Sequence, residues 1–172
     1  MSRAKMSCAM LLTAFGVMLL PIAMGAQALP QPAPIPAKLL GKTVFLSNAG
    51  SDSGLFPSPF SGGPSRAYDY LYAALKRDGT YTLVNDPAAA DLVFEIRVTA
   101  PSGPQNPSKV NGASDPLPMA RLVIYDRPTH YVLWADTQSV DVALLQKTHD
   151  ANFDRALDRL LTDLKSVAMP NP

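Results

Sequence analysis

Large apolar residues occupy every second position from Leu92 to Val98, which is the most regular pattern along the chain. Neighbouring side chains on a strand point to opposite faces of a sheet, so this period of two predicts a strand with one buried face. Shorter apolar runs bounded by turn-forming residues predict further strands at 42–46, 81–84, 121–125 and 131–134. The last two flank a short polar turn and are predicted to form a hairpin.

Two other segments place apolar residues at the spacing of an amphipathic helix. The first follows Ser65, a predicted N-cap, and ends before Gly79, a residue type that commonly terminates helices; its stripe is Tyr68, Leu71, Tyr72 and Leu75. The second lies near the end of the chain and carries charged residues on its outer face; its stripe is Phe153, Ala156, Leu157, Leu160, Leu161, Leu164 and Val167.

Each helix has one apolar stripe, and each stripe needs a sheet face to cover. The order of elements is strand, helix, two strands, a long loop, a hairpin and a helix. We therefore expect an α+β fold over residues 38–169, with a single mixed sheet of about five strands and two helices packed on one face. Two segments without periodicity, rich in Gly, Pro and Ser, are predicted as loops: 48–65 as a contact loop or flap, and 101–118 as a mobile surface loop.

The first 28 residues have the three parts of a secretory signal peptide. Arg3 and Lys5 form a basic start, residues 6–24 carry no charge, and Ala26-Gln27-Ala28 has the small-residue pattern of a cleavage site. Cleavage after Ala28 would leave an exported protein, periplasmic or extracellular, that meets a membrane only through the segment removed. The alternative is an uncleaved membrane anchor. Alternating prolines predict an extended spacer at 29–37.

Composition narrows the function further. The chain of 172 residues carries 15 basic and 14 acidic side chains, so no large positive field points to nucleic acid as a partner. Cys8 is the only cysteine, which excludes a disulfide scaffold and a cysteine-ligated zinc site. The sequence indicates no cofactor.

Two segments resemble a pattern of the bacterial envelope. They are Ala90-Asp91 followed by the apolar Leu92-Val93, and a hairpin in which Leu122-Val123-Ile124-Tyr125-Asp126 is followed by Thr129 and by Val132-Leu133-Trp134. Over residues 42–168 the chain resembles a family of short exported bacterial proteins of uncharacterised function. It is distantly similar to the periplasmic α+β domain of lipoproteins of the curli-secretion-channel and penicillin-binding-protein-activator types.

The resemblance implies a non-enzymatic envelope domain that works through contacts, and it transfers no catalytic residue. Two departures stand out. His130-Tyr131 replaces the glycine of the hairpin pattern, and Leu29, not a lipidated cysteine, would begin the mature chain.

Catalytic candidates are few. Asp52-Ser53-Gly54 is similar to a serine-hydrolase fragment, and a nucleophilic serine needs a histidine base within hydrogen-bond reach. Only His130 and His149 could serve, so a small secreted serine hydrolase using Ser53 with either histidine is the alternative function. Asp126 and His130 share one turn, but two ligands do not make a metal site, and we expect no metal.

Candidate binding residues lie in the loops. Phe56 and Phe60 stand between prolines in a polar segment, where they form either an exposed contact patch or a plug folded back onto the sheet edge. His130 is a third candidate, at the hairpin tip, while Trp134 is expected in the core. The resulting hypothesis is an exported domain that binds an envelope protein through loops 48–65 and 101–118.

Overall fold

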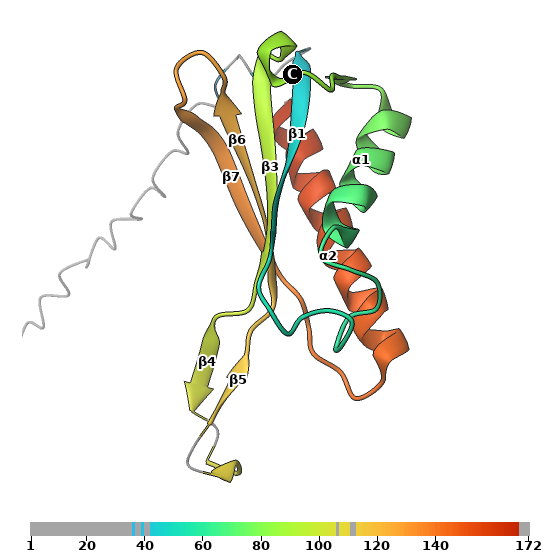
Figure 1. The fold of residues 1–172 in the computed structure, drawn as a ribbon, viewed down its shortest axis with the longest axis vertical. Coiled ribbons are helices and arrows are strands. Elements are labelled where there is room, and N and C mark those ends of the chain that lie inside the picture. Colours follow the sequence, from blue (N-terminus) through green and yellow to red (C-terminus); the bar gives the residue numbers. More distant parts are fainter. Residues whose placement is uncertain (1–35, 37–38, 40–41, 106, 111–112, 169–172) are drawn as a thin grey trace, which may run out of the picture. The chain divides into compact units, whose positions relative to one another are not determined.

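Five strands form one mixed sheet in the order β2-β1-β3-β6-β7 (Figure 1). In the computed structural model these strands are β1 Thr43–Ser51, β2 Thr82–Leu83, β3 Leu92–Thr99, β6 Met119–Asp126 and β7 Val132–Ser139. β1 runs parallel to β2 and β3, and the pairs β3–β6 and β6–β7 are antiparallel. Helices α1 (Arg66–Asp78) and α2 (Gln146–Ala168) lie on one face of the sheet, as predicted (Figure 1).

The structure describes residues 36, 39, 42–105, 107–110 and 113–168. The predicted signal peptide at 1–28, and all of the predicted spacer at 29–37 except Pro36, lie outside these residues. Within the described ranges, neither long helix combines the length and apolar character required to cross a membrane.

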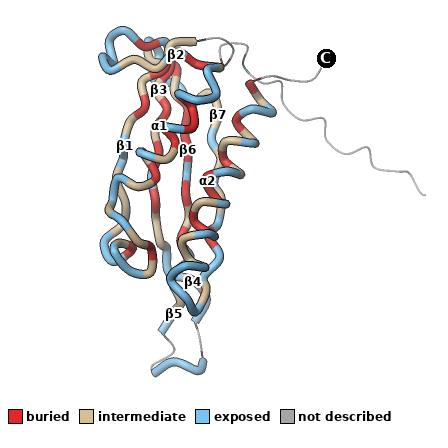
Figure 2. The backbone as a smooth tube through the Cα atoms, turned by 90° about the vertical axis from the view of Figure 1, so that its right-hand side faces the viewer, coloured by how far each residue is buried: buried red, intermediate tan, exposed pale blue. Residues whose placement is uncertain are grey.

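The core lies between the sheet and the two helices. The alternating residues of β3 behave as predicted: Leu92, Phe94, Ile96 and Val98 are buried under the helices. Phe153, Leu157, Leu160 and Leu164 of α2 are buried against them. Figure 2 shows the result, with buried positions following the central strands and recurring along one side of α2. Trp134 is half-buried and packs against this core.

The predicted ends of α1 have different outcomes. Gly79 ends the helix in the left-handed conformation, at φ +72°, and its N–H donates to the Leu75 carbonyl, which confirms the predicted stop. Ser65 occupies the N-cap position, but its side chain makes no capping hydrogen bond to the backbone. The hydroxyl donates instead to the Asp69 carboxylate at 3.0 Å, one turn into the helix.

Both predicted loops contain more strand than expected. β1 continues to Ser51, because it stays paired with β3 as far as Val98 across a register shift. The segment 101–118 is not simply a mobile loop, since it forms a small hairpin of β4 (Ser102–Gln105) and β5 (Ser114–Pro116). This hairpin extends the direction of β3 and β6 beyond their last pair, Thr99 with Met119. A Cβ atom at Gly103 would lie 2.6 Å from the Asp115 carbonyl oxygen, so the close approach of the two strands requires glycine there.

Candidate functional site

The two predicted contact loops lie at the same end of the sheet. β1 and β3 run in parallel and finish at this end, where β6 begins and β7 finishes (Figure 1). Segments 48–65 and 101–118, together with the connection 140–145 from β7 to α2, therefore lie at one end. We call these three segments the loop end. The β6–β7 turn lies at the opposite end of the sheet.

Aromatic packing holds segment 48–65 against α2. Phe60 is 0% exposed, and its ring centroid lies 5.0 Å from that of Phe153. Phe56 is half-buried, with its ring 5.9 Å from the same phenylalanine. Of the two arrangements expected from the sequence, the structure shows the folded-back one, although the rings pack on Phe153 of α2 where the sheet edge was expected. The expectation of an exposed patch is therefore corrected for Phe60, because burial of a large apolar ring outweighs its exposure in a polar loop.

An ionic clamp made by Arg66, Asp150 and Asp154 ties the same segment to α2. The guanidinium of Arg66 donates to the Asp150 carboxylate at 2.5 Å and to the Asp154 carboxylate at 2.7 Å. It also donates to the Ser61 carbonyl at 3.1 Å and lies over the Phe153 ring. Sequence reasoning did not find this clamp, because its partners are more than 80 residues apart along the chain.

The clamp shifts the titration of Asp150. Burial acts to raise the pKa of this carboxyl, but hydrogen bonds from the Ser61 backbone N–H and from Arg66 outweigh it, so the pKa lies below its usual value. The carboxylate is therefore charged at neutral pH and keeps the hydrogen bonds that hold segment 48–65 on α2.

Most of the exposed large apolar side chains that the structure describes lie in the three segments of the loop end. Among the described residues seven large hydrophobic side chains are exposed, and five of them lie in these segments: Val110, Leu117, Val142, Leu144 and Leu145. Leu144 is 102% exposed and Leu145 is 69% exposed, immediately before α2 begins. The sequence analysis did not identify these exposed residues. A signal for Leu144 and Leu145 is nevertheless present in the sequence, because the apolar stripe of the following helix begins only at Phe153 and does not include them.

His130 lies away from the other two candidate binding residues. It occupies the β6–β7 turn, where its backbone N–H donates to the Asp126 carbonyl at 2.8 Å. Asp126 accepts a hydrogen bond from the Thr129 hydroxyl. The structure therefore does not bring His130 together with Phe56 and Phe60. Within the described ranges, no group of three potential His, Cys, Asp or Glu ligands surrounds a point that could hold a metal ion.

Replacing His130 with glycine is expected to raise the free energy of unfolding by about 0.5 kcal/mol. His130 has φ +59°, a left-handed conformation that costs a side-chain-bearing residue energy and that glycine adopts freely. Urea denaturation measures the change. His130→Ala, which keeps the strain and removes the imidazole, is the matched control. Equal or lower stability of the glycine variant relative to the alanine variant would contradict the prediction.

The serine-hydrolase arrangement is not assembled. In the part of the chain that the structure describes, Ser53 makes no hydrogen bond to either histidine, and His130 lies at the other end of the sheet. His149 is engaged elsewhere: its Nδ1 accepts from the Ala143 N–H at 3.3 Å, and its ring packs edge-on against Phe60. No observation favours Ser53 as a nucleophile, so we do not propose this activity.

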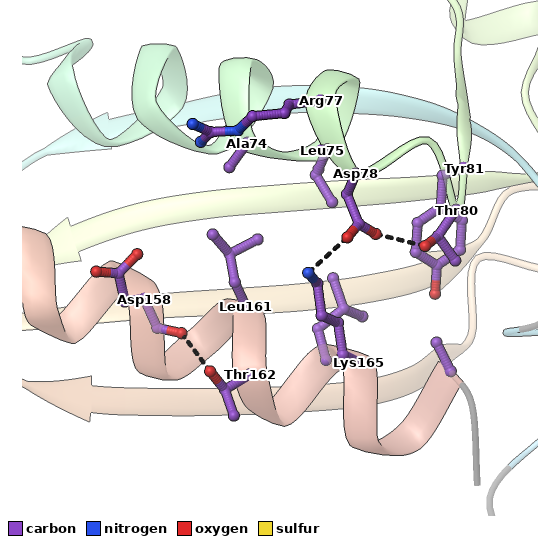
Figure 3. Close-up of a pocket in the computed structure, with 12 residues that line it drawn as sticks. Ala74, Leu75, Arg77, Asp78, Thr80, Tyr81, Asp158, Leu161, Thr162 and Lys165 are labelled. Atoms are coloured by element: carbon purple, nitrogen blue, oxygen red, sulfur yellow. Dashed lines mark hydrogen bonds and ion pairs between the residues drawn. The ribbon is translucent and has the colours of Figure 1, made fainter.

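A groove of about 570 Å³ separates the C-terminal halves of α1 and α2 (Figure 3). Its apolar lining includes Leu75, Leu161 and Leu164, while charged side chains stand at its rim. Three of them, Asp78, Asp158 and Lys165, are engaged with local partners. Lys165 pairs with Asp78 at 2.5 Å and lowers the pKa of that carboxyl, while Asp158 accepts from the Tyr70 hydroxyl at 2.6 Å. The groove therefore combines an apolar floor with a rim on which three of the four charged side chains have a local partner.

Comparison with known proteins finds likeness in fold only. No family model matches the sequence, and no curated protein matches it. Three of the similar solved structures are the LpoB C-terminal domain from Escherichia coli, the PelC dodecamer from Paraburkholderia phytofirmans and Lipoprotein GNA1162 from Neisseria meningitidis. Their identities to this chain are 14%, 14% and 13%, with TM-scores of 0.41, 0.43 and 0.34.

Alignment with these structures covers 60%, 82% and 71% of this chain and 85%, 96% and 94% of theirs, in the same order. The chain is thus structurally similar to these proteins, with a TM-score below 0.5 in each case. At this level of identity the similarity assigns no activity, ligand or partner to the chain.

Proposed function

We propose that this chain is an exported, non-enzymatic cell-envelope domain that binds another envelope component through the loop end. Export rests on the basic start, uncharged middle and Ala-x-Ala end of residues 1–28. Binding rests on segments 48–65 and 101–118, joined by 140–145. His130 is not part of this surface, because it lies at the other end of the sheet.

The clustering of exposed apolar side chains at the loop end is the observation that carries the proposal. Single exposed hydrophobic residues are common on protein surfaces, but several at one end of a domain indicate an interaction site. Here five of the seven exposed large hydrophobic side chains among the described residues share that end. Leu144 and Leu145 contribute the most exposed pair, and a partner that covers them gains the free energy of burying two leucines.

A rigid base makes such a surface specific. Phe60 and the ionic clamp hold segment 48–65 on α2, so the loop loses little conformational freedom when a partner binds. In this arrangement Phe56 and Phe60 hold segment 48–65 in place, and the exposed Leu144 and Leu145 contact the partner. The nearly balanced charge of the chain points to a protein partner and not to nucleic acid.

Substitution of both Leu144 and Leu145 by serine is expected to reduce partner capture at least about tenfold, because two buried leucines contribute roughly 3 kcal/mol or more. The measurement is in-cell photo-crosslinking from positions 110 and 142, with the captured species identified by mass spectrometry. The proposal expects the same envelope component from both positions. The protein recovered from the periplasm is expected to begin at Leu29.

The matched control is Tyr131→Ser with Val132→Ser, which removes the two exposed apolar side chains at the opposite end of the sheet. Capture from 110 and 142 should be unchanged in this variant. Undiminished capture in the leucine variant, or equal loss in the control, would rule out the loop end as the binding surface.

A further inference from the structure

β7 is an edge strand that leaves hydrogen-bonding groups available along its outer side. It is eight residues long and ends the sheet order, with β6 on its inner side (Figure 1). The other edge strand, β2, has only two residues. A very short edge strand offers little backbone for pairing, whereas a long one is a template for a further strand.

The register shows which backbone groups face outward. Val140 donates its N–H to the Pro118 carbonyl, so hydrogen-bonded positions toward β6 recur at every second residue from there. The alternate residues Ala135, Thr137 and Ser139 therefore direct their N–H and C=O groups away from β6. Arg159 of α2 donates to the outward carbonyl of Ser139 at 2.8 Å. Among the described residues, no backbone bond reaches the outward groups of Ala135 and Thr137.

Two common protections of an edge strand, proline and lysine, are missing from β7. Between Val132 and Ser139 the sequence has no proline and no lysine, the two residue types that most often block edge pairing. The one irregularity of the β6–β7 pairing lies at its first residues, where the register shifts between Ile124 and Tyr125. The stretch from Trp134 to Ser139 pairs with β6 without a register shift.

Two carboxylates stand beside the middle of this edge, on the helix side of the sheet. The side-chain amide of Gln138 donates to Asp136 at 2.9 Å and to Asp163 of α2 at 2.8 Å, so a single neutral amide lies between both acids. Burial, followed by the nearby Asp136 carboxylate, raises the pKa of Asp163, while Arg159 opposes the shift. The local excess of negative charge would be relieved by a cation placed opposite Asp136.

We propose that the outer edge of β7 binds an extended segment of a partner protein as an additional antiparallel strand, with a lysine or arginine of that segment opposite Asp136. Ala135 and Thr137 provide the main-chain hydrogen bonds, a mode of recognition that many peptide-binding domains use. Asp136 points its backbone groups toward β6, so relative to the new strand it is a non-hydrogen-bonded position. Side chains at such positions approach most closely, which brings the partner's cation beside Asp136 and Asp163.

A second copy of the chain fits this edge less well. If two β7 strands paired about a two-fold axis near Thr137, Asp136 and Asp163 of both copies would gather around that axis. Like charges that close to each other destabilise a strand pair. The edge therefore favours a basic strand over its own sequence.

The test uses the full-length chain and two eight-residue peptides of alternating valine and threonine, one with a central lysine and one with glutamate in its place. Hydrogen exchange of the Ala135 and Thr137 amides is expected to slow at least about tenfold when the lysine peptide binds. The glutamate peptide is expected to bind at least about tenfold more weakly. Asp136→Asn should reduce the difference in affinity between the lysine peptide and the glutamate peptide.

Two controls separate edge pairing from other contacts. Thr137→Pro removes an outward N–H without breaking a bond to β6 and should abolish binding, whereas Thr137→Val keeps that N–H and should not. A lysine peptide methylated on the backbone nitrogens that face β7 tests the same bonds on the unaltered protein. Unchanged exchange at millimolar lysine peptide, or equal affinity for both peptides, would overturn the proposal. So would protection that rises with protein concentration alone, which would assign the edge to a second copy.

Discussion

Replacing Phe60 with alanine is expected to lower the free energy of unfolding by about 3–5 kcal/mol, the range for a phenylalanine lost from a well-packed core. Phe60 is 0% exposed, and its ring contacts those of Phe56, Phe153 and His149. A loss of this size removes a large part of the stability of a typical domain. Urea denaturation, followed by circular dichroism, measures it.

Phe56→Ala is the matched control for this substitution. Phe56 lies in the same loop and touches the same Phe153 ring, but it is only half-buried. Its replacement should cost clearly less, about 1–2 kcal/mol. If the Phe60 variant lost less than about 1 kcal/mol, segment 48–65 would not be packed on α2 in solution, and the rigid base of the proposed binding surface would be lost with it.

Replacing Arg66 with methionine is expected to lower the free energy of unfolding by about 2 kcal/mol at neutral pH. Methionine keeps much of the apolar length of the side chain but removes the guanidinium, so the Asp150 carboxylate loses its charged partner. The side chains of Arg66 and Asp150 are 18% and 22% exposed, which reduces the effect below that of a fully buried pair.

This effect depends on pH in a defined direction. The pKa of Asp150 is lowered in the folded protein, so its contribution to stability is present above the ordinary aspartate pKa of 3.8, which applies to the unfolded chain. The contribution is lost as the pH falls through the lower folded-state pKa. The difference between wild type and Arg66→Met should therefore be largest near pH 7 and should shrink below about pH 4.

Arg97→Met provides the control for the loss of a positive charge. Its guanidinium lies 3.7 Å from Asp52 and its side chain is 56% exposed, so the expected cost is below about 1 kcal/mol at any pH. Urea denaturation of the three proteins at pH 7 and pH 3 makes the comparison. A difference between wild type and the Arg66 variant that did not change with pH would contradict the assigned role of Asp150.

The sequence predicted the elements whose burial repeats at a regular period. The strand at 92–99 and the helix around 153–167 each have one apolar side, and the structure places these sides together in the core. Hairpin β4–β5 was missed, because its Pro, Gly and Ser content is typical of loops and its pairing depends on the strands that precede it.

The candidate site was harder to predict than the fold. The location of the loops was anticipated, but the direction in which Phe60 points depends on Phe153, more than 90 residues further along the chain. The Arg66 clamp depends on the same long-range approach. Leu144 and Leu145 are exposed because of how α2 packs on the sheet. A short apolar run in the sequence does not show whether its side chains are buried or exposed.

Hairpin β4–β5 has a consequence for how related chains can diverge. The ladder of the main sheet ends at Thr99 and Met119, and in the described ranges β4 and β5 pair with each other and not with the main sheet. Doubling the length of such a connection costs only about 0.6 kcal/mol of closure entropy. Insertions or deletions between these two residues therefore change how far the protein extends toward a partner while its core stays the same. The length of hairpin β4–β5 can therefore differ between related proteins that share the same fold.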